Sequence, residues 1–442
     1  MKHLLFLIAG LAFCLSIQAN DSIPKAKDYF GSSDKDREIG LPENFEMDLD
    51  SLLQVWHVKT FVPIDQNCKS DSIDPVFSDE EIMKQLSEMP TAIKLPFNQI
   101  IRQFIDMYSG KKRKQVAVML GVSNYYFPIF EQTLEKYNMP NELKYLAVVE
   151  SALNPKANSK VGAAGLWQFM IGTGKVYGLE INSLLDERRD PIKSTDAAVR
   201  YLKDLYGIYG DWHLAIAAYN CGPGTVNKAI HRSGGKRDYW DIYYYLPKET
   251  RGYVPLFIAA NYVMTYYKEH LICPVQTYYP MHTDTIMVDK RMHFDQISAV
   301  IGVPSEDLEV LNPQYRRKII PGTPEKPMAL CLPANYTLCF LDNQDSIPNY
   351  MADELLDTQL TVEPAPIEQS VIRPSRSGRL SKSARARARA RASKSNHFYR
   401  VKSGDTLSEI AEHYHVNLAK LKRKNNLSSS NKLRLGQRLK IN

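Results

Sequence analysis

Apolar residues recur at helical spacing through the middle of the chain, and this pattern is lost on either side of it. The spacing of three and four positions is present in four segments, namely 97–137, 195–209, 212–220 and 251–270. Because such stripes usually form the interior of a helical domain, we expect residues 96–273 to form one mainly helical domain around a single core. Residues 20–95 show no clear period, apart from a short helix predicted over 79–86, and we assign them no function.

One predicted helix, over 141–153, carries an acid on its apolar side. Leu143, Leu146 and Ala147 fall on one face of it, and Glu150 is the next position on that face. A carboxyl group pressed against apolar neighbours loses the solvation of its charged form, so its pKa should rise. A raised pKa is what a general acid needs near neutral pH. The alternative is a partly exposed glutamate near the end of a helix.

The segment after this helix combines small and aromatic residues. Glycine and alanine fill positions 162–165, and Trp167, Gln168 and Phe169 follow them. Small residues let the backbone approach a ligand closely. We interpret the two aromatic rings as a flat apolar surface beside an amide, which suits a sugar ring with N-acetyl groups. Clusters of this kind also occur in ordinary protein cores.

Three motifs in a fixed order now point to a family. They are ESALNPKANSKVGAAGLWQFM from Glu150, AIAAYNCGPGTV from Ala215 and LPKETRGYVP from Leu246. Together they resemble the catalytic signature of the lytic transglycosylases with a goose-type lysozyme fold. Within that family the chain resembles the membrane-bound type D, which couples this domain to C-terminal LysM modules. The resemblance implies a mainly α lysozyme-like catalytic domain of the α+β class over 96–273.

The resemblance also implies which side chains line a saccharide groove. Glu150 would be the catalytic residue, and the substrate-binding residues would be Ser159, Gln168, Tyr219, Asn220 and Tyr253. Tyr219 and Asn220 stand at a helix end that a Gly-Pro-Gly segment breaks, although a core tyrosine and a capping asparagine would give the same pattern. Tyr253 would hydrogen-bond either the reacting N-acetyl group or Glu150.

The number of carboxyl groups bears on the mechanism. Most glycosidases use two of them, yet no Asp or Glu lies between Ser151 and Leu179, and Glu249 is the only acid in the later motifs. One acid suffices if the N-acetyl oxygen of the substrate stabilises the positive centre. The resemblance implies that Glu150 protonates the oxygen between MurNAc and GlcNAc and then deprotonates the muramyl C6 hydroxyl, which gives 1,6-anhydro ends. A hydrolytic lysozyme and a non-catalytic scaffold that binds peptidoglycan are the alternatives, and we expect neither a cofactor nor a metal.

An internal repeat follows the helical domain. A constant offset pairs Ile286 with Tyr399, Val288 with Val401, Phe294 with Leu407, Ile297 with Ile410, Val303 with Val416, Leu308 with Leu421 and Asn312 with Asn425. The second copy, over 397–442, resembles a LysM module with βααβ order, and we predict a capping box from Thr406 to Glu409. LysM modules bind N-acetylglucosamine-containing glycans. The first copy, over 280–341, has an insertion near 319–327, and we interpret it as a degenerate LysM-like module with either a glycan-binding or a purely structural role.

The N-terminus predicts export. Lys2 and His3 precede an apolar run over 4–17, which is typical of a signal peptide. We expect residues 1–19 to be removed by cleavage after Ala19, and lipid modification of Cys14 is the alternative. Either route leads to the periplasm or the cell envelope.

The cysteines that remain after export are odd in number and form no CxxC motif. They are Cys68, Cys221, Cys273, Cys331 and Cys339. This pattern does not support a metal site. A pairing of Cys331 with Cys339 is one interpretation, and we favour buried free thiols.

Positive charge is concentrated at the C-terminal end. Segment 373–394, within a linker over 342–396, has nine basic residues and no acid, and 397–442 has a net charge of +7, so the rest of the chain carries −9 within a total of +7. A run of like charges repels itself and favours disorder. We expect either a solvated spacer or binding to anionic envelope surfaces. Export and the lack of interleaved aromatic residues argue against nucleic acid.

Overall fold

The computed structural model describes most of the chain between 74 and 356 and parts of the two ends. The described residues are 64, 68, 74–277, 279–280, 282–356, 398–401, 407, 410–411, 414, 418–425, 427 and 437–441. The chain divides into two compact units between Gln369 and Ser370. The predicted signal peptide, Cys14, the basic segment 373–394 and the Thr406–Glu409 capping box lie outside the described residues. Within the described part, no helix has both the length and the apolarity needed to cross a bilayer.

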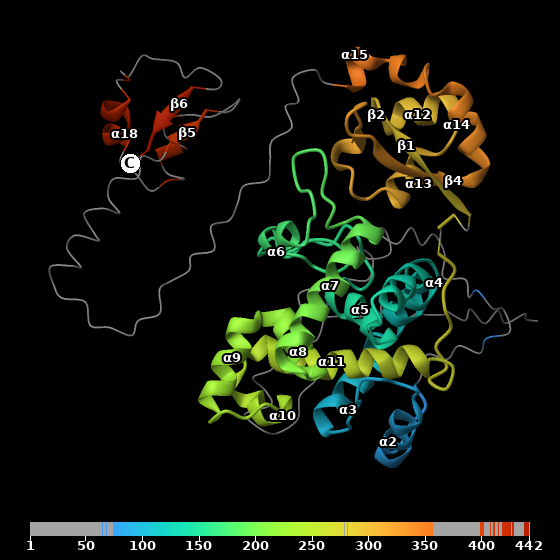
Figure 1. Cartoon of the computed structure of the whole chain (residues 1–442), viewed down its shortest axis with the longest axis vertical. Helices are drawn as coiled ribbons and strands as arrows, with labels where there is room; N and C mark the ends of the chain where they lie inside the picture. The colour runs from blue at the N-terminus through green and yellow to red at the C-terminus, as the bar shows by residue number, and fades with distance from the viewer. Residues whose placement is uncertain are drawn as a thin grey trace, which may run out of the picture. The chain divides into compact units, whose positions relative to one another are not determined.

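The described part of the first unit contains a helical domain (Figure 1). Its helices are α2 (Asp79–Glu88), α3 (Gln99–Asp106), the π-helix η4 (Met107–Lys111), α4 (Arg113–Lys136), the 3-10 helix η5 (Asn141–Tyr145), α5 (Leu146–Ser151), α6 (Ile171–Val176), α7 (Pro191–Tyr209), α8 (Trp212–Cys221), α9 (Pro223–Arg232), α10 (Tyr239–Ile242), the 3-10 helix η6 (Tyr243–Tyr245) and α11 (Lys248–Thr265). The helices predicted over 195–209 and 212–220 are therefore confirmed as α7 and α8.

Helix α11 is the central element of this domain. It packs against α3, α5 and α8 (Figure 1), and every residue from Thr250 to Met264 is buried. A helix that is covered on all sides belongs to the interior of a domain. The helix predicted over 251–270 is confirmed, but it ends at Thr265 because the chain turns over 266–271.

The core of the domain continues into the N-terminal extension. Ile82 and Leu86 of α2, together with Met89 and Ile93, are buried in the same cluster as the residues of α11. The predicted short helix is confirmed as α2, and Ser78 and Glu81 cap it reciprocally. The hydrophobic core therefore does not stop at residue 95.

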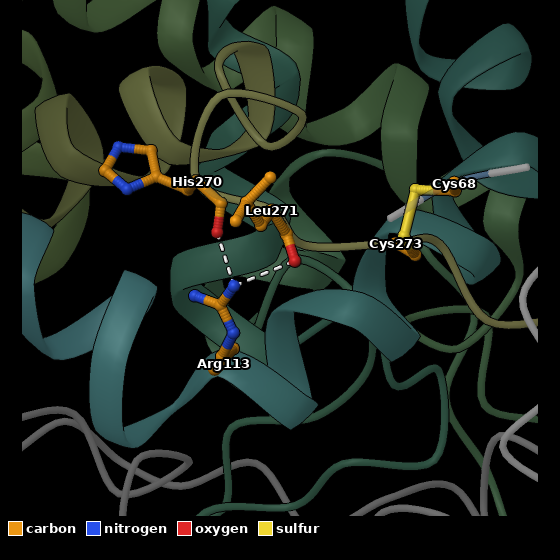
Figure 2. The surroundings of a disulfide bond; sticks show 5 residues. All are labelled: Cys68, Arg113, His270, Leu271 and Cys273. Carbon is orange, nitrogen blue, oxygen red and sulfur yellow. Dashed lines mark hydrogen bonds between the residues drawn. A yellow bond between two sulfur atoms is a disulfide. The ribbon is translucent and has the colours of Figure 1, made fainter. Parts of the chain in front are cut away.

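A disulfide between Cys68 and Cys273 joins the N-terminal extension to the end of the helical domain (Figure 2). The backbone N–H of Ile64 also donates a hydrogen bond to the carbonyl oxygen of Pro274, at 2.9 Å. Our interpretation of both cysteines as free thiols is wrong, because the extension has no sequence pattern that would place Cys68 beside Cys273. The cysteines Cys221 and Cys331 are free and half-buried, and Cys339 is free and exposed, so the last two do not pair.

Polar contacts strengthen the same junction. Nδ1 of His270 lies 2.8 Å from Oδ1 of Asp74, and Arg113 donates hydrogen bonds to the backbone carbonyl oxygens of His270 and Leu271 (Figure 2). The hydrogen bond to His270 holds the pKa of the Asp74 carboxyl below its usual value, although burial opposes this shift. The extension is thus attached by a covalent bond and by a buried polar cluster.

Removing the disulfide should destabilise the first unit. The bond closes a loop with a sequence separation of 205 residues, so we expect the double variant Cys68→Ser/Cys273→Ser to lose roughly 2–5 kcal/mol of unfolding free energy. Urea unfolding with and without reductant measures this loss. Cys339→Ser serves as the control and should unfold like the wild type. A wild-type protein whose stability does not change in reductant would contradict the prediction.

The first copy of the repeat forms a small α/β module within the same unit. Strand β1 (Thr283–Val288) pairs antiparallel with β4 (Met328–Pro333), and β2 (Arg291–His293) pairs with β3 (Ile319–Pro321). Its helices are α12 (Phe294–Ile301), α13 (Ser305–Leu311), the 3-10 helix η7 (Arg316–Lys318), the 3-10 helix η8 (Ala334–Tyr336), α14 (Thr337–Asn343), the 3-10 helix η9 (Ile347–Asn349) and α15 (Ala352–Leu355). Phe340 and Ile347 lie in its core, so the folded module continues beyond residue 341.

The second unit contains the described part of the second copy. Strands β5 (Phe398–Arg400) and β6 (Arg438–Lys440) form an antiparallel pair, and α18 (Leu418–Lys424) accompanies them. The side chains of its small core are Val401, Ile410, Ala411, Leu421, Leu439 and Ile441. The two strands of the βααβ order predicted from the sequence are confirmed.

One asparagine has the same hydrogen bonds in both copies. The amide of Asn312 donates to the carbonyl oxygens of Leu308 and Cys331, at 2.9 and 2.6 Å, and accepts from the N–H of Cys331. The amide of Asn425 makes the equivalent bonds with Leu421 and Lys440. The chain from the asparagine to its strand partner is 19 residues in the first copy and 15 in the second. The predicted repeat and its insertion are therefore confirmed.

Candidate active site

Glu150 stands near the end of the short helix α5. The four residues before it, 146–149, are buried, and the hydroxyl of Ser151 donates to the carbonyl oxygens of Ala147 and Leu166, at 3.0 and 2.9 Å. The helix ends in two residues with left-handed backbone, Ala152 and Leu153, whose φ values are 51° and 60°. Such strain in residues other than glycine persists only where the surroundings enforce it, and it is common at functional sites. The predicted helix over 141–153 is thus divided and shorter.

The carboxyl group of Glu150 is half-buried and accepts a hydrogen bond from a buried tyrosine. The hydroxyl of Tyr253, on α11, donates to its Oε1. Burial raises the pKa of Glu150 to about 8; the Tyr253 hydrogen bond opposes the shift and the charge of Glu249 adds to it. The group is therefore protonated at neutral pH. The sequence left two partners open for Tyr253, and in this structure its hydroxyl donates to Glu150.

Tyr219 and Asn220 lie at the end of α8, which packs against α11. The Tyr219 hydroxyl donates to the carbonyl oxygen of Trp167, at 2.8 Å. Burial raises the pKa of Tyr219, and the nearby Glu150 charge contributes to this shift. The Asn220 Oδ1 accepts a hydrogen bond from Thr250, at 2.8 Å. The structure thus places Tyr219 and Tyr253 beside Glu150 and ties Asn220 to the start of α11.

The hydrogen bonds of Ser159 and Gln168 stay within their own loop. The Ser159 hydroxyl accepts from the N–H of Ala163, at 3.0 Å. Gln168 has a left-handed backbone, with φ 47°, and its amide donates to the carbonyl oxygens of Gly165 and Ala157. These bonds shape the loop 154–170, which leads from Glu150 to the Trp167 carbonyl that Tyr219 contacts.

The aromatic residues of this loop are interior residues. Trp167 is 0% and Phe169 3% exposed, and the Trp167 Nε1 donates to Thr195 inside the domain, at 2.9 Å. Our interpretation of the two rings as a surface for a sugar is therefore wrong, and the alternative of an ordinary core cluster holds. The small residues do allow a close approach, but to another part of the chain and not to a ligand. A Cβ on Gly165 would lie 1.8 Å from the carbonyl oxygen of Arg188.

Arg188 holds this loop in place, and the sequence did not reveal it. Its guanidinium pairs with Asp186, at 2.8 Å, and donates to the carbonyl oxygens of Gly162 and Phe169, at 2.8 and 3.0 Å. The arginine and the aspartate are both buried. The only signal was the charged run DERRD over 186–190, which looks like a solvated surface. Thr250, the partner of Asn220, was likewise missed because threonine on a buried helix is common.

Comparison with known proteins identifies the family. Residues 127–242 match the model of the transglycosylase SLT domain, residues 282–349 the LysM-like domain of lytic transglycosylase MltD, and residues 399–442 the LysM domain. The chain belongs to the lytic murein transglycosylases, with a lysozyme-like helical domain followed by LysM-like modules. It is similar to the membrane-bound lytic murein transglycosylase D of Escherichia coli K12, with 31% identity over 352 residues, which cover 78% of this chain and 70% of that protein.

Two further comparisons match smaller shares of the chain. The soluble lytic murein transglycosylase of Escherichia coli K12 is 32% identical over 153 residues, which cover 32% of this chain and 24% of that protein. The crystal structure of the 70 kDa soluble lytic transglycosylase from Escherichia coli has a TM-score of 0.30 and 26% identity, covering 39% of this chain and 31% of that one. The family predicted from the three sequence motifs is confirmed by the relative that spans most of the chain.

Proposed function

We propose that this chain cleaves the β-1,4 bond between MurNAc and GlcNAc in peptidoglycan without water, leaving 1,6-anhydro-MurNAc ends. The observation that carries this proposal is the half-buried Glu150, whose pKa of about 8 keeps it protonated at neutral pH and whose Oε1 receives the Tyr253 hydrogen bond. A protonated carboxyl is ready to donate to a leaving oxygen. The names of its relatives, which are murein transglycosylases, agree with this substrate.

The proposed reaction uses one carboxyl group twice. Glu150 gives its proton to the glycosidic oxygen as the C1–O4 bond breaks, and the N-acetyl oxygen of the substrate stabilises the positive charge at C1. The carboxylate that forms accepts the Tyr253 hydrogen bond. It then takes the proton of the C6 hydroxyl as the C1–O6 bond forms, so Glu150 returns to its starting state. Ser159, Gln168, Tyr219 and Asn220 would hold the saccharide around this centre.

The position of Glu249 supports a single-acid route. Glu249 is exposed in the first turn of α11, where its charge raises the pKa of Glu150. Inverting and retaining glycosidases need a second carboxyl that faces the reacting bond. Mass spectrometry of digested sacculi tests the proposal: anhydro ends support it, reducing ends would indicate a hydrolytic lysozyme, and the absence of cleavage would indicate a scaffold.

The flanking segments would keep the enzyme at its substrate. The C-terminal LysM module, over 397–442, would bind peptidoglycan glycan strands, and the basic segment 373–394 would add attraction to anionic envelope surfaces. We place the protein in the periplasm or cell envelope, after signal cleavage or with a lipid on Cys14. The concentration of positive charge beside the LysM module supports this arrangement, because a tethered binding module raises the local concentration of the catalytic domain on its substrate.

Tyr253→Phe should shift the pH dependence of cleavage upward. The lost hydrogen bond stabilises the Glu150 carboxylate and lowers its pKa, so its removal raises the pH at which the acid form is lost. The alkaline limb of kcat/KM should move to higher pH. The rate at pH 7 should fall about tenfold or more, because a hydrogen bond to a charged group contributes roughly 1.5–3 kcal/mol.

A tyrosine on the same helix provides the matched control for this prediction. The Tyr262 hydroxyl donates to Gln85, and its ring is equally buried. Tyr262→Phe should leave the pH profile of cleavage unchanged, even if stability falls. An identical shift in both variants, or an unchanged limb in Tyr253→Phe, would contradict the role of Tyr253.

A further inference from the structure

A cavity of about 480 Å³ lies where the helical domain meets the first LysM-like module. Both parts belong to the first compact unit. The N–H of Arg316 donates to the carbonyl oxygen of Leu184, at 2.7 Å, the N–H of Asp186 donates to that of Gln314, at 2.9 Å, and Leu185 is buried in the core of the module. The walls of the cavity are therefore fixed by backbone bonds and apolar packing. Its volume is typical of a site for a small ligand or a peptide end.

The wall of this cavity is strongly basic. Its charged residues are Lys156, Arg189, Arg316, Arg317, Lys318 and a single acid, Glu309. Glu309 pairs with both lysines, at 3.5 Å from Lys156 and 2.7 Å from Lys318. No acid among the lining residues is left for the three arginines. The cavity therefore has excess positive charge that an anionic ligand would neutralise.

One arginine of the wall has an unused donor. The Nε of Arg189 is buried and makes no hydrogen bond to any residue that the structure describes. Its nearest carboxylate, on Asp186, is 3.9 Å away and already accepts from Arg188 at 2.8 Å. Buried donors are normally satisfied, so an exception calls for an explanation. A bound anion would supply the missing acceptor.

The backbone of the wall is also strained. Arg317 and Lys318 both adopt left-handed conformations, with φ 59° and 58°, in the short helix η7. Left-handed backbone in residues other than glycine is strained and persists only where the surroundings enforce it. Arg317 and Lys318 both line the cavity, so two consecutive strained residues of its wall are basic.

We propose that this cavity binds the carboxylates of the peptide stem on the peptidoglycan substrate. The inference rests on the proposed function, because the stem branches from the MurNAc residue that the active site would hold. Lys156 of the cavity and Ser159 and Gln168 of the candidate groove belong to one loop, 154–170, so a glycan along this loop presents its stem near the cavity. Guanidinium groups bind carboxylates through paired hydrogen bonds. The first LysM-like module would then select peptide-bearing strands.

The double variant Arg316→Gln/Arg317→Gln tests this proposal. Its substrates are peptide-bearing glycan strands and the same strands after an amidase has removed the peptides. We expect KM for the peptide-bearing strands to rise about tenfold with kcat unchanged, because each exposed ion pair contributes only a few-fold, and KM for the stripped strands to stay the same. An Arg316→Lys/Arg317→Lys variant should recover part of the loss.

A charge-matched control separates the cavity from general attraction. Lys228→Gln/Lys290→Gln removes two positive charges from exposed positions outside the cavity. It should leave both KM values unchanged. Equal effects of the two double variants, or equal losses on both kinds of strand, would overturn the proposal.

Direct titration with the free stem peptide makes the result independent of catalysis. The wild type should bind the peptide, the arginine double variant should bind it about tenfold more weakly, and added salt should weaken the wild-type binding. A wild-type chain that binds the peptide but cuts neither strand would reject the proposed function alone. A chain that cuts both strands and binds no peptide would reject the cavity proposal alone.

Discussion

Glu150→Gln is expected to abolish the cleavage of peptidoglycan while the domain stays folded. Glutamine has the shape of protonated glutamic acid but gives no proton to a leaving oxygen. General acid and base help of this kind contributes about 10²–10⁴-fold, and in the proposed mechanism Glu150 supplies both steps. Mass spectrometry of digested sacculi should therefore detect no anhydro-muropeptides from the variant. Normal cleavage by folded Glu150→Gln would remove the assignment.

The same substitution should stabilise the protein at alkaline pH. Glu150 has a usual pKa of 4.5 and a folded-state pKa of about 8, so the folded state binds its proton more tightly than the unfolded chain. Wild-type stability is therefore lost as the pH rises from about 4.5 to 8. The glutamine side chain in the variant does not titrate and avoids this loss. Thermal unfolding should show equal stability near pH 4 and a more stable variant at pH 8.

Glu249→Gln is the matched control for the loss of cleavage that we expect from Glu150→Gln. It removes the exposed charge that raises the pKa of Glu150 but leaves the proposed acid in place. Cleavage should persist, and its alkaline limb should move to slightly lower pH. If Glu249→Gln were as inactive as Glu150→Gln, Glu249 would be a second catalytic carboxyl, and the single-acid mechanism would be wrong.

Local periodicity was enough to predict the elements that bury a continuous face. The helices α7, α8 and α11 follow directly from apolar spacing, and the repeated asparagines Asn312 and Asn425 predicted two copies that the structure confirms through identical hydrogen bonds. Glu150 was identifiable for the same reason, since an acid occupied a position that the helical pattern reserves for apolar residues. The apolar spacing and the position of Glu150 are signals that lie within a few residues of one another, and the repeat is found by comparing two segments of the same chain.

The features that the sequence did not reveal depend on contacts between distant segments. Cys68 meets Cys273 across 205 positions, and nothing near Cys68 predicts that approach. Trp167 looked like a sugar platform because a loop beside glycines is usually exposed, but its indole N–H has a partner in Thr195 on α7, which allows the whole ring to be buried. The basic cavity likewise brings together residues of two modules that lie far apart in the sequence, such as Lys156 and Arg317.

The second large effect is expected from Gly165→Ala, which should displace the loop 154–170 and destabilise the helical domain. Gly165 has φ +87°, and an added Cβ would lie 1.8 Å from the carbonyl oxygen of Arg188. That carbonyl cannot move freely, because the Arg188 side chain is buried in its pair with Asp186 and holds Gly162 and Phe169. A left-handed alanine costs about 1–2 kcal/mol, and forced overpacking adds roughly 1–3 kcal/mol.

Gly178→Ala is the control that separates the cost of left-handed backbone in alanine from the cost of the clash with Arg188. Gly178 has nearly the same φ, +85°, but no atom of the described residues would lie within 4 Å of a methyl group added there. It should therefore lose only about 1–2 kcal/mol and keep its activity. Gly165→Ala should lose more in urea unfolding and should also lose cleavage, because the displaced loop carries the Trp167 carbonyl that positions Tyr219 beside Glu150. Equal stability losses in the two variants would mean that Arg188 yields to the added methyl group, and the loop would then not be the rigid support of the active site.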